Sequence, residues 1–351
     1  MKVGQSARAV LFLPLLVLAH NTAEAEDVAD FYRGKQIRIV IGSDVGGGYD
    51  IYARTVGRHL GKHIPGNPTI VPQNMNGAGS RIAANWVYNI GAKDGTIIGQ
   101  VSQGTPLDQA RKQEGVQFDA AKMQWIGNPV VDNLNTTSWR ESGLATIDDV
   151  RTKGGLVCGG SGASTPGQVY PLVLNRLLGT TIRTISGYPG TGTVNLAMER
   201  GEINCVAGYA WSSLTSQVPQ WLDQHKLNLL VQWGPRKDPA AEKYQGRDVP
   251  LILNFARDSL ERRALELIVS GVSVGRPFFV APDVPAERVT ALRRAFDATM
   301  NDPEFRADAA RQSVNIAPIT GEELQKIASD VAYAPPDVLR QADALMAPTD
   351  K

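Results

Sequence analysis

The sequence predicts an α/β fold of two similar lobes, each a mainly parallel sheet flanked by helices, with a cleft between them. Three observations predict this fold. Strand-like apolar runs alternate with helical patterns along most of the chain, which is typical of parallel sheets covered by helices. Several of these strands end in glycine loops directly before a helix. The unit of strand, glycine loop and helix then restarts in the second half of the chain.

The first such unit is the most informative. Residues 37–41 form a β-branched run that predicts a buried strand. Residues 46–48 are glycines, which permit a sharp turn and leave N–H groups open. Residues 52–60 then place apolar side chains on one helical face. A helix start of this kind favours a bound anion, although a tight β–α turn without a ligand explains the loop equally well.

Later elements follow the same rule. Strands are expected in 69–74 and 96–101 of the first lobe, and in 155–158, 181–186 and 203–207 of the second. The C-terminal tail is helical, with a capping box at Thr320–Glu323. We expect residues 1–25 to be a signal, 26–125 and 273–351 to form the first lobe, and 126–272 to form the second. Ligands in open α/β sheets bind beyond the carboxyl ends of the strands, so the glycine loops indicate the site.

The N-terminus has the pattern of an export signal. Lys2 and Arg8 precede an apolar run in 9–19, and Ala23–Ala25 is a small-x-small cleavage pattern. We expect cleavage near Ala25 and a periplasmic mature chain, and an uncleaved anchor is the alternative. The formal charge of the whole chain is +1, which argues against a nucleic-acid partner.

The two cysteines leave two alternatives open. Cys158 ends one predicted strand and Cys205 lies in another of the same lobe. An oxidising compartment permits a disulfide, but adjacent parallel strands often give poor disulfide geometry. Two buried free thiols are therefore an equal alternative.

Signals for catalysis are weak, and we expect no enzyme, no cofactor and no metal. His59 and His63 have a helical metal-ligand spacing without a third ligand, so solvated surface histidines explain them better. Residues 159–163 only resemble a nucleophile elbow around Ser161, because alanine replaces the last glycine. His225 is the only histidine downstream of Ser161, which makes an exported serine hydrolase a weak alternative.

The remaining chemistry is polar, uncharged and rich in N–H donors. Four segments precede predicted helices: 46–50, 77–80, 161–165 and 190–193. Their hydroxyl and N–H groups can hold a carboxylate without an arginine. This is the chemistry of reversible binding.

These motifs resemble the periplasmic solute-binding proteins of tripartite tricarboxylate transporters, also called Bug-type receptors. The family's Gly-Gly-x-x-Asp loop matches 46–50, its Asn-x-x-Gly-Ala-Gly-Gly segment is similar to 74–80, and its Asp-Gly pair matches 94–95. Its Tyr-x-Gly-Ser/Thr loop matches 188–191, and its Ala-Pro-x-x-Pro segment matches 281–285.

The resemblance implies a type II-like periplasmic binding protein, expected to be a monomer. It would close on a small, carboxylated organic anion and deliver it to the permease subunits of a tripartite transporter. A sensor of the same fold is the alternative, and the identity of the solute stays open. The expected ligand-binding residues are Gly46, Gly47, Gly48, Tyr49, Asp50, Ser102, Gln103, Ser161, Ser164, Thr165, Gln168, Tyr188, Gly190 and Thr191.

The chain also departs from the family pattern. Ser43 and Asp44 stand where an aromatic residue and a proline are usual, and Gln168 stands where a histidine is common. Tyr209 and Trp211 replace an acidic stretch, and they either stack on a cyclic solute or, as we favour, pack in the hinge. The usual family ligand therefore cannot be assumed.

Overall fold

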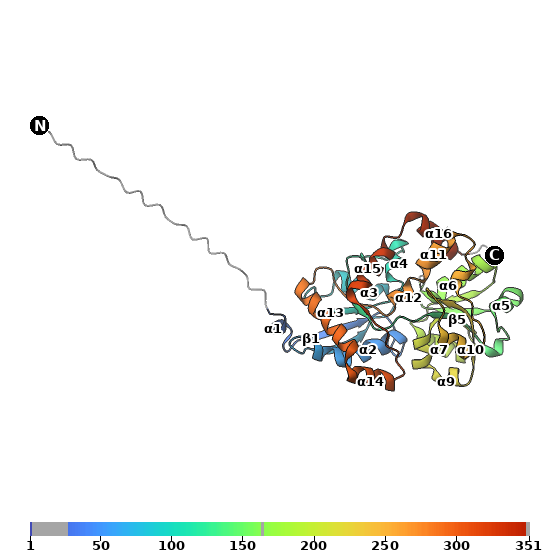
Figure 1. The fold of residues 1–351 in the computed structure, drawn as a ribbon, viewed down its shortest axis with the longest axis horizontal. Helices are drawn as coiled ribbons and strands as arrows, with labels where there is room; N and C mark the ends of the chain where they lie inside the picture. Colours follow the sequence, from blue (N-terminus) through green and yellow to red (C-terminus); the bar gives the residue numbers. More distant parts are fainter. Residues whose placement is uncertain (2–26, 163–164, 349–351) are drawn as a thin grey trace.

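The computed structural model describes Met1 and residues 27–162 and 165–348. Apart from Met1, the predicted signal lies outside the described residues, as does Ser164. Two α/β lobes lie side by side in Figure 1, which confirms the predicted fold class. None of the helices in the described ranges combines the length and the apolar character needed to cross a bilayer.

The first lobe is built on a sheet with the strand order β11-β4-β10-β3-β1-β2. Apolar clusters cover both of its faces. Its strands are β1 (Gln36–Ile41), β2 (Thr69–Asn74), β3 (Ile97–Gln100), β4 (Gln124–Asn128), β10 (Phe278–Val280) and β11 (Ile319–Thr320). Its helices are α1 (Val28–Tyr32), α2 (Gly48–Leu60), α3 (Arg81–Asn89), α4 (Thr105–Ala110), α13 (Ala286–Asn301), α14 (Pro303–Arg311) and α15 (Gly321–Ala332).

The second lobe is built on a sheet with the order β7-β6-β8-β5-β9. Its strands are β5 (Leu134–Trp139), β6 (Val157–Gly160), β7 (Arg183–Ser186), β8 (Cys205–Ala210) and β9 (Leu227–Trp233). Its helices are α5 (Ile147–Lys153), α6 (Pro166–Leu178), α7 (Thr191–Glu199), α8 (Trp211–Gln217), α9 (Pro219–Asp223), α10 (Pro239–Gln245) and α11 (Ser259–Val269). The short helix α12 (Gly271–Val274) leads back toward the first lobe.

Strand directions follow from where the chain crosses between lobes. β1 to β4 point the same way, and so do β6 to β9. The exceptions are β5 and β10, which run antiparallel to their neighbours, and the short β11. A chain that leaves one sheet at the cleft enters the other sheet from the cleft, so β5 and β10 must run away from it. The remaining strands end at the cleft, as the glycine loops predicted.

The last helix differs from the expected lobe boundaries. α16 (Pro336–Met346) packs on α6 and α11, and its side chains Val338, Ala342 and Leu345 join the core of the second lobe. Figure 1 shows α16 beside α11, across from α13 and α14. The predicted assignment of the whole 273–351 segment to the first lobe is therefore wrong for this helix. Its apolar face completes the second core because α6 and α11 leave that core uncovered there.

The two cysteines form a disulfide. Cys158 in β6 and Cys205 in β8 are directly paired in the parallel register, and their Cα atoms lie 4.3 Å apart. Both side chains are fully buried. The alternative of two free thiols is wrong for this structure.

Helix α6 begins at Pro166 and runs through Pro171. Proline is well tolerated at a first helical position, whereas Pro171 removes one N–H from the helix interior. The side chain of Pro171 is buried.

Candidate ligand-binding site

A cavity of about 130 Å³ lies between the lobes, where the strands of both sheets end. The lobes touch at its mouth. A Cβ atom built on Gly162 would lie 2.9 Å from the backbone nitrogen of Gly79, so backbone meets backbone across the cleft. An engineered cavity of similar size, about 150 Å³, holds benzene. This cavity therefore suits a small organic molecule.

Half of the predicted site residues line this cavity. They come from the ends of β3, β6 and β7 and from the first turn of α2. They are Tyr49, Ser102, Gln103, Ser161, Thr165, Gly190 and Thr191. Ser164 lies outside the described residues. Hydroxyl groups and helix starts of both lobes thus converge on one space.

The other predicted residues do not line the cavity. Gly46 is exposed, and Gly47 and Gly48 are buried in the turn that starts α2. Tyr188 packs on the apolar cluster around Val194 and Trp221. The Nε2 atom of Gln168 is buried without a hydrogen-bond partner among the described residues. Asp50 is the sixth predicted residue that does not line the cavity. The motif positions alone indicated all six, and their role in binding stays a prediction.

Asp50 orders the loop from inside. Its carboxylate is almost completely buried. It accepts hydrogen bonds from the Gly46 N–H at 2.9 Å, from Asn74 Nδ2 at 2.9 Å and from Arg54 Nε at 2.8 Å. The carboxylate therefore ties the glycine loop to α2 and to the end of β2.

We expect Asp50→Ala to destabilise the protein by about 2 kcal/mol, because a partly buried ion pair is broken and two donors lose their acceptor. Solute affinity is expected to fall as well, since the loop borders the cavity. Urea unfolding followed by circular dichroism measures the loss. Asp50→Asn, which keeps one acceptor oxygen, is the matched control and should lose less. An unchanged urea midpoint for the alanine variant would contradict this role.

Arg276 is the residue that sequence reasoning missed. It follows α12 and precedes β10, lines the cavity and is only 6% exposed. Its Nη2 atom donates to Ser213 Oγ at 2.7 Å and to Ser212 Oγ at 3.1 Å. The guanidinium carbon lies 5.1 Å from the ring centre of Tyr49 and 4.7 Å from that of Tyr52. Arg276 therefore adds a cation to the hydroxyl and N–H groups expected around the cavity.

The charge of Arg276 is only partly compensated. Among the described residues, no carboxylate lies within ion-pair distance of its guanidinium, and its Nε atom has no hydrogen-bond partner. Gly48 explains how the cation reaches α2, because a Cβ at position 48 would lie 2.7 Å from Arg276 Nη1. A buried cation without an ion-pair partner is costly, so a bound anion would stabilise it.

Asp132 is the second charged residue of the cavity wall. It lies in the segment that joins β4 to β5, and its Oδ2 atom accepts a hydrogen bond from the Ser212 N–H at 2.5 Å. Burial raises the pKa of its carboxyl, while Arg276 and Ser212 act in the opposite direction. Asp132 lies between β4 and β5, and Arg276 lies between α12 and β10, in two segments that connect the lobes. The end of the cavity next to these connections therefore carries one carboxylate and one guanidinium.

The histidines lie away from this site. His59 Nε2 lies 3.1 Å from Asp308 Oδ2, and His63 Nε2 lies 2.9 Å from Asp302 Oδ2. His59, Asp302 and Glu304 converge closely enough to consider a metal ion, but Lys62 Nζ already lies 2.6 Å from both carboxylates. The two histidines are thus half-buried against carboxylates of α14 and of the residue before it, rather than fully solvated.

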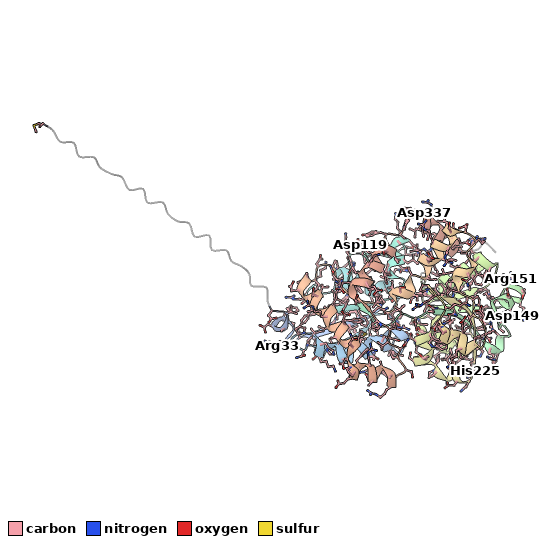
Figure 2. All side chains as sticks on the ribbon, viewed as in Figure 1. Arg33, Asp119, Asp149, Arg151, His225 and Asp337 are labelled. Carbon is pink, nitrogen blue, oxygen red and sulfur yellow. A yellow bond between two sulfur atoms is a disulfide. The ribbon has the colours of Figure 1, made fainter. Side chains whose placement is uncertain are left out.

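A serine hydrolase lacks its base. Ser161 lines the cavity, but no histidine is found among the described residues that surround it. His225 stacks on Tyr244, with 5.4 Å between ring centres, and Figure 2 places it at the outer edge of the second lobe. A Ser161–His225 pair is therefore not formed.

Tyr209 and Trp211 pack within the second lobe rather than in the hinge. Tyr209 is buried, and its hydroxyl donates to Asn195 Oδ1 at 2.6 Å, although its residue also borders the cavity. Trp211 packs edge-on against Tyr244, with 5.9 Å between ring centres. Both rings therefore stabilise the second lobe.

Comparisons with known proteins agree with this architecture. No protein-family model matches the chain. A curated protein of Cupriavidus necator, described as "UPF0065 protein in gbd 5'region", is 26% identical over 314 residues, which cover 87% of this chain and 86% of that protein.

Solved structures share the fold at lower identity. The periplasmic binding protein BugD has a TM-score of 0.69 at 15% identity, over 90% of this chain and 98% of its own. A TctC solute-binding protein from Polaromonas has a TM-score of 0.59 at 17% identity, over 89% and 99%. MatC from Rhodopseudomonas palustris, solved with bound malate, has a TM-score of 0.64 at 16% identity, over 89% and 99%.

Two of these solved structures are described as binding proteins, a TctC solute-binding protein and the periplasmic binding protein BugD. At such identities the solved structures establish the fold. The chain has the two-lobed fold of the TctC and Bug periplasmic binding proteins, which confirms the resemblance indicated by its glycine-loop motifs.

Proposed function

We propose that this chain is an extracytoplasmic receptor that captures a small carboxylated solute by lobe closure and delivers it to a membrane permease of the tripartite tricarboxylate type. Arg276 is the observation that carries the proposal. Its buried guanidinium lines the cavity without an ion-paired carboxylate among the described residues. A solute carboxylate would supply the missing charge through strong, charge-assisted hydrogen bonds.

Further features support the same function. Hydroxyl groups and helix starts from both lobes line the cavity, so a ligand would gain its full set of contacts only when the lobes close. The relative MatC was solved with malate, a carboxylate. A micromolar receptor needs about 8 kcal/mol of net binding free energy, which several charged hydrogen bonds of about 1.5–3 kcal/mol each can supply.

A thermal-shift screen tests carboxylate binding. The mature chain is heated with short carboxylates and with the corresponding neutral amides, and hits are confirmed by isothermal titration calorimetry. Selected carboxylates are expected to raise the melting temperature, since ligand at a hundred times its Kd adds about 2.7 kcal/mol of stability. Equal stabilisation by the amides, or none by any acid, would refute the proposal. Uptake of the confirmed solute by the native host, with and without this receptor, then tests delivery.

Export makes a separate prediction. We expect the mature protein from its native host to begin near Glu26, because cleavage after Ala25 follows the small-x-small pattern. Intact-mass spectrometry of the periplasmic fraction measures this directly. A chain that retains Met1 and the apolar run would remove the argument for a periplasmic location.

A further inference from the structure

The start of helix α7 is already occupied by a carboxylate of the protein itself. Asp44 lies in the loop after β1, in the first lobe, and α7 belongs to the second lobe. The first turn of α7 lies against the Asp44 carboxylate, as the glycines at positions 190 and 192 show. A Cβ atom built on Gly190 would overlap this carboxylate, and one built on Gly192 would lie 3.6 Å from its Oδ2 atom. Asp44 thus reaches across the cleft to the first turn of α7.

The loop holds Asp44 firmly in this position. Ser43 Oγ donates to Asp44 Oδ1 at 3.1 Å, and the Gly47 N–H donates to the Asp44 carbonyl oxygen at 3.4 Å. A Cβ on Gly47 would lie 2.5 Å from Asp44 Oδ1. Glycine is therefore required on both sides of the carboxylate, at positions 47 and 190, for it to fit between the lobes.

Occupation of α7 changes which anions the cavity accepts. Gly190 and Thr191 line the cavity, so the start of α7 was one of the places expected to hold a solute carboxylate. Anions bind well at helix starts through free N–H groups and the helix dipole. With Asp44 seated there, a second carboxylate of a solute loses this partner and meets a negative charge in its place.

The charged residues that line the cavity also disfavour a second solute carboxylate. Among the described lining residues, Arg276 is the only cation and Asp132 the only acid. Asp44 adds a second carboxylate beside Gly190, a residue of the cavity wall. One solute carboxylate is matched by Arg276, whereas a second finds no cation and two nearby acids. Like charges brought into a site closed to water repel strongly.

We propose that this receptor is selective for solutes that carry a single carboxylate, with Asp44 taking the position of a second one. This inference rests on the proposed function, because it assumes that the cavity binds a carboxylate. It names the substrate class as small monocarboxylates and Asp44 as the specificity-determining residue.

Matched pairs of acids test the inference. Isothermal titration calorimetry on the mature chain compares propionate with malonate, butyrate with succinate, pentanoate with glutarate and hexanoate with adipate. For the chain length that binds best, we expect the monocarboxylate to bind at least about tenfold more tightly than the dicarboxylate, a difference of about 1.4 kcal/mol.

Asp44→Ala vacates the start of α7 and removes the charge. We expect it to raise dicarboxylate affinity at least about tenfold and to change monocarboxylate affinity much less. Asp44→Asn, which keeps the size and removes only the charge, should give an intermediate gain. Asp148→Ala removes an exposed carboxylate of the second lobe and should leave both affinities unchanged. Melting curves of the unliganded variants confirm that each one is folded.

The outcomes separate this inference from the function on which it rests. Dicarboxylates that bind the wild type at least as tightly as monocarboxylates would overturn the selectivity. So would an unchanged affinity ratio in both Asp44 variants. If neither class of acid binds any form of the protein, the proposed function fails and the inference fails with it.

Discussion

Arg276→Gln is expected to lower solute affinity at least about 100-fold while the protein remains folded. Removing one partner of a buried, hydrogen-bonded charge pair costs about 2–5 kcal/mol, and 1.4 kcal/mol corresponds to a factor of ten. The guanidinium is 6% exposed and has no ion-pair partner among the described residues, so water and neighbouring carboxylates cannot replace the lost contact.

The unliganded variant should be at least as stable as the wild type. Replacing the buried cation by a neutral side chain removes the free-energy cost of its burial, which we expect to offset the lost hydrogen bonds to Ser212 and Ser213. The expected signature is therefore an unchanged or higher melting temperature without solute, together with loss of the shift that solute produces. A solely structural role for Arg276 predicts the reverse, a lower melting temperature and a retained shift.

Two control variants sharpen this test. Arg276→Lys keeps the charge but lacks the planar fork of donors, so we expect an intermediate loss of affinity. Arg262→Gln removes an exposed arginine on α11, which pairs with Glu266, and should change nothing. Calorimetric titration of all four proteins with one confirmed carboxylate decides the matter. Retention of wild-type affinity by Arg276→Gln would show that the solute is held elsewhere.

Loss of the Cys158–Cys205 disulfide is expected to destabilise the second lobe by about 4 kcal/mol. The bridge spans a sequence separation of 47 residues, and the chain-entropy model assigns about 4 kcal/mol to a loop of this length. For a lobe of this size the change corresponds to a fall in melting temperature of roughly 10 °C. The matched variant is Cys158→Ala with Cys205→Ala, since serine would bury a hydroxyl group.

Calorimetry of the oxidised, reduced and double-alanine proteins measures the effect. Alkylation of the unfolded, unreduced protein, followed by mass spectrometry, should find no free thiol. Two alkylated cysteines would show that the bridge does not form in the protein. A double variant with the same melting temperature as the wild type would show that the disulfide forms without stabilising the fold.

The sequence predicted those parts of the fold that depend on local pattern. The β-branched run before Gly42, the alternation of strands and helices, and the glycines at helix starts each follow from neighbouring residues alone. The convergence of Tyr49, Ser102 and Thr165 on one cavity also follows, because strands of like direction end at one edge of a sheet.

The parts that could not be predicted depend on where distant segments meet. An arginine between Gly275 and Pro277 has the pattern of a surface turn. Only the crossing of the return segment between α2 and α8 buries it. Asp44 departs from the family pattern, but its contact with Gly190 exists only because the lobes close on each other. The placement of α16 likewise depends on the uncovered core of the opposite lobe.

The helix α16 also has a mechanical consequence. In the described part of the chain, the backbone passes between the lobes in 129–133, in 275–277 and again in 333–335, just before α16. With two connecting segments the lobes can both open and twist relative to each other, whereas a third segment leaves opening and closing about one axis as the easiest movement. Each closure then brings the loops of the two lobes back to the same relative positions. Little orientational entropy remains to be lost on capture, so more of the contact energy appears as affinity.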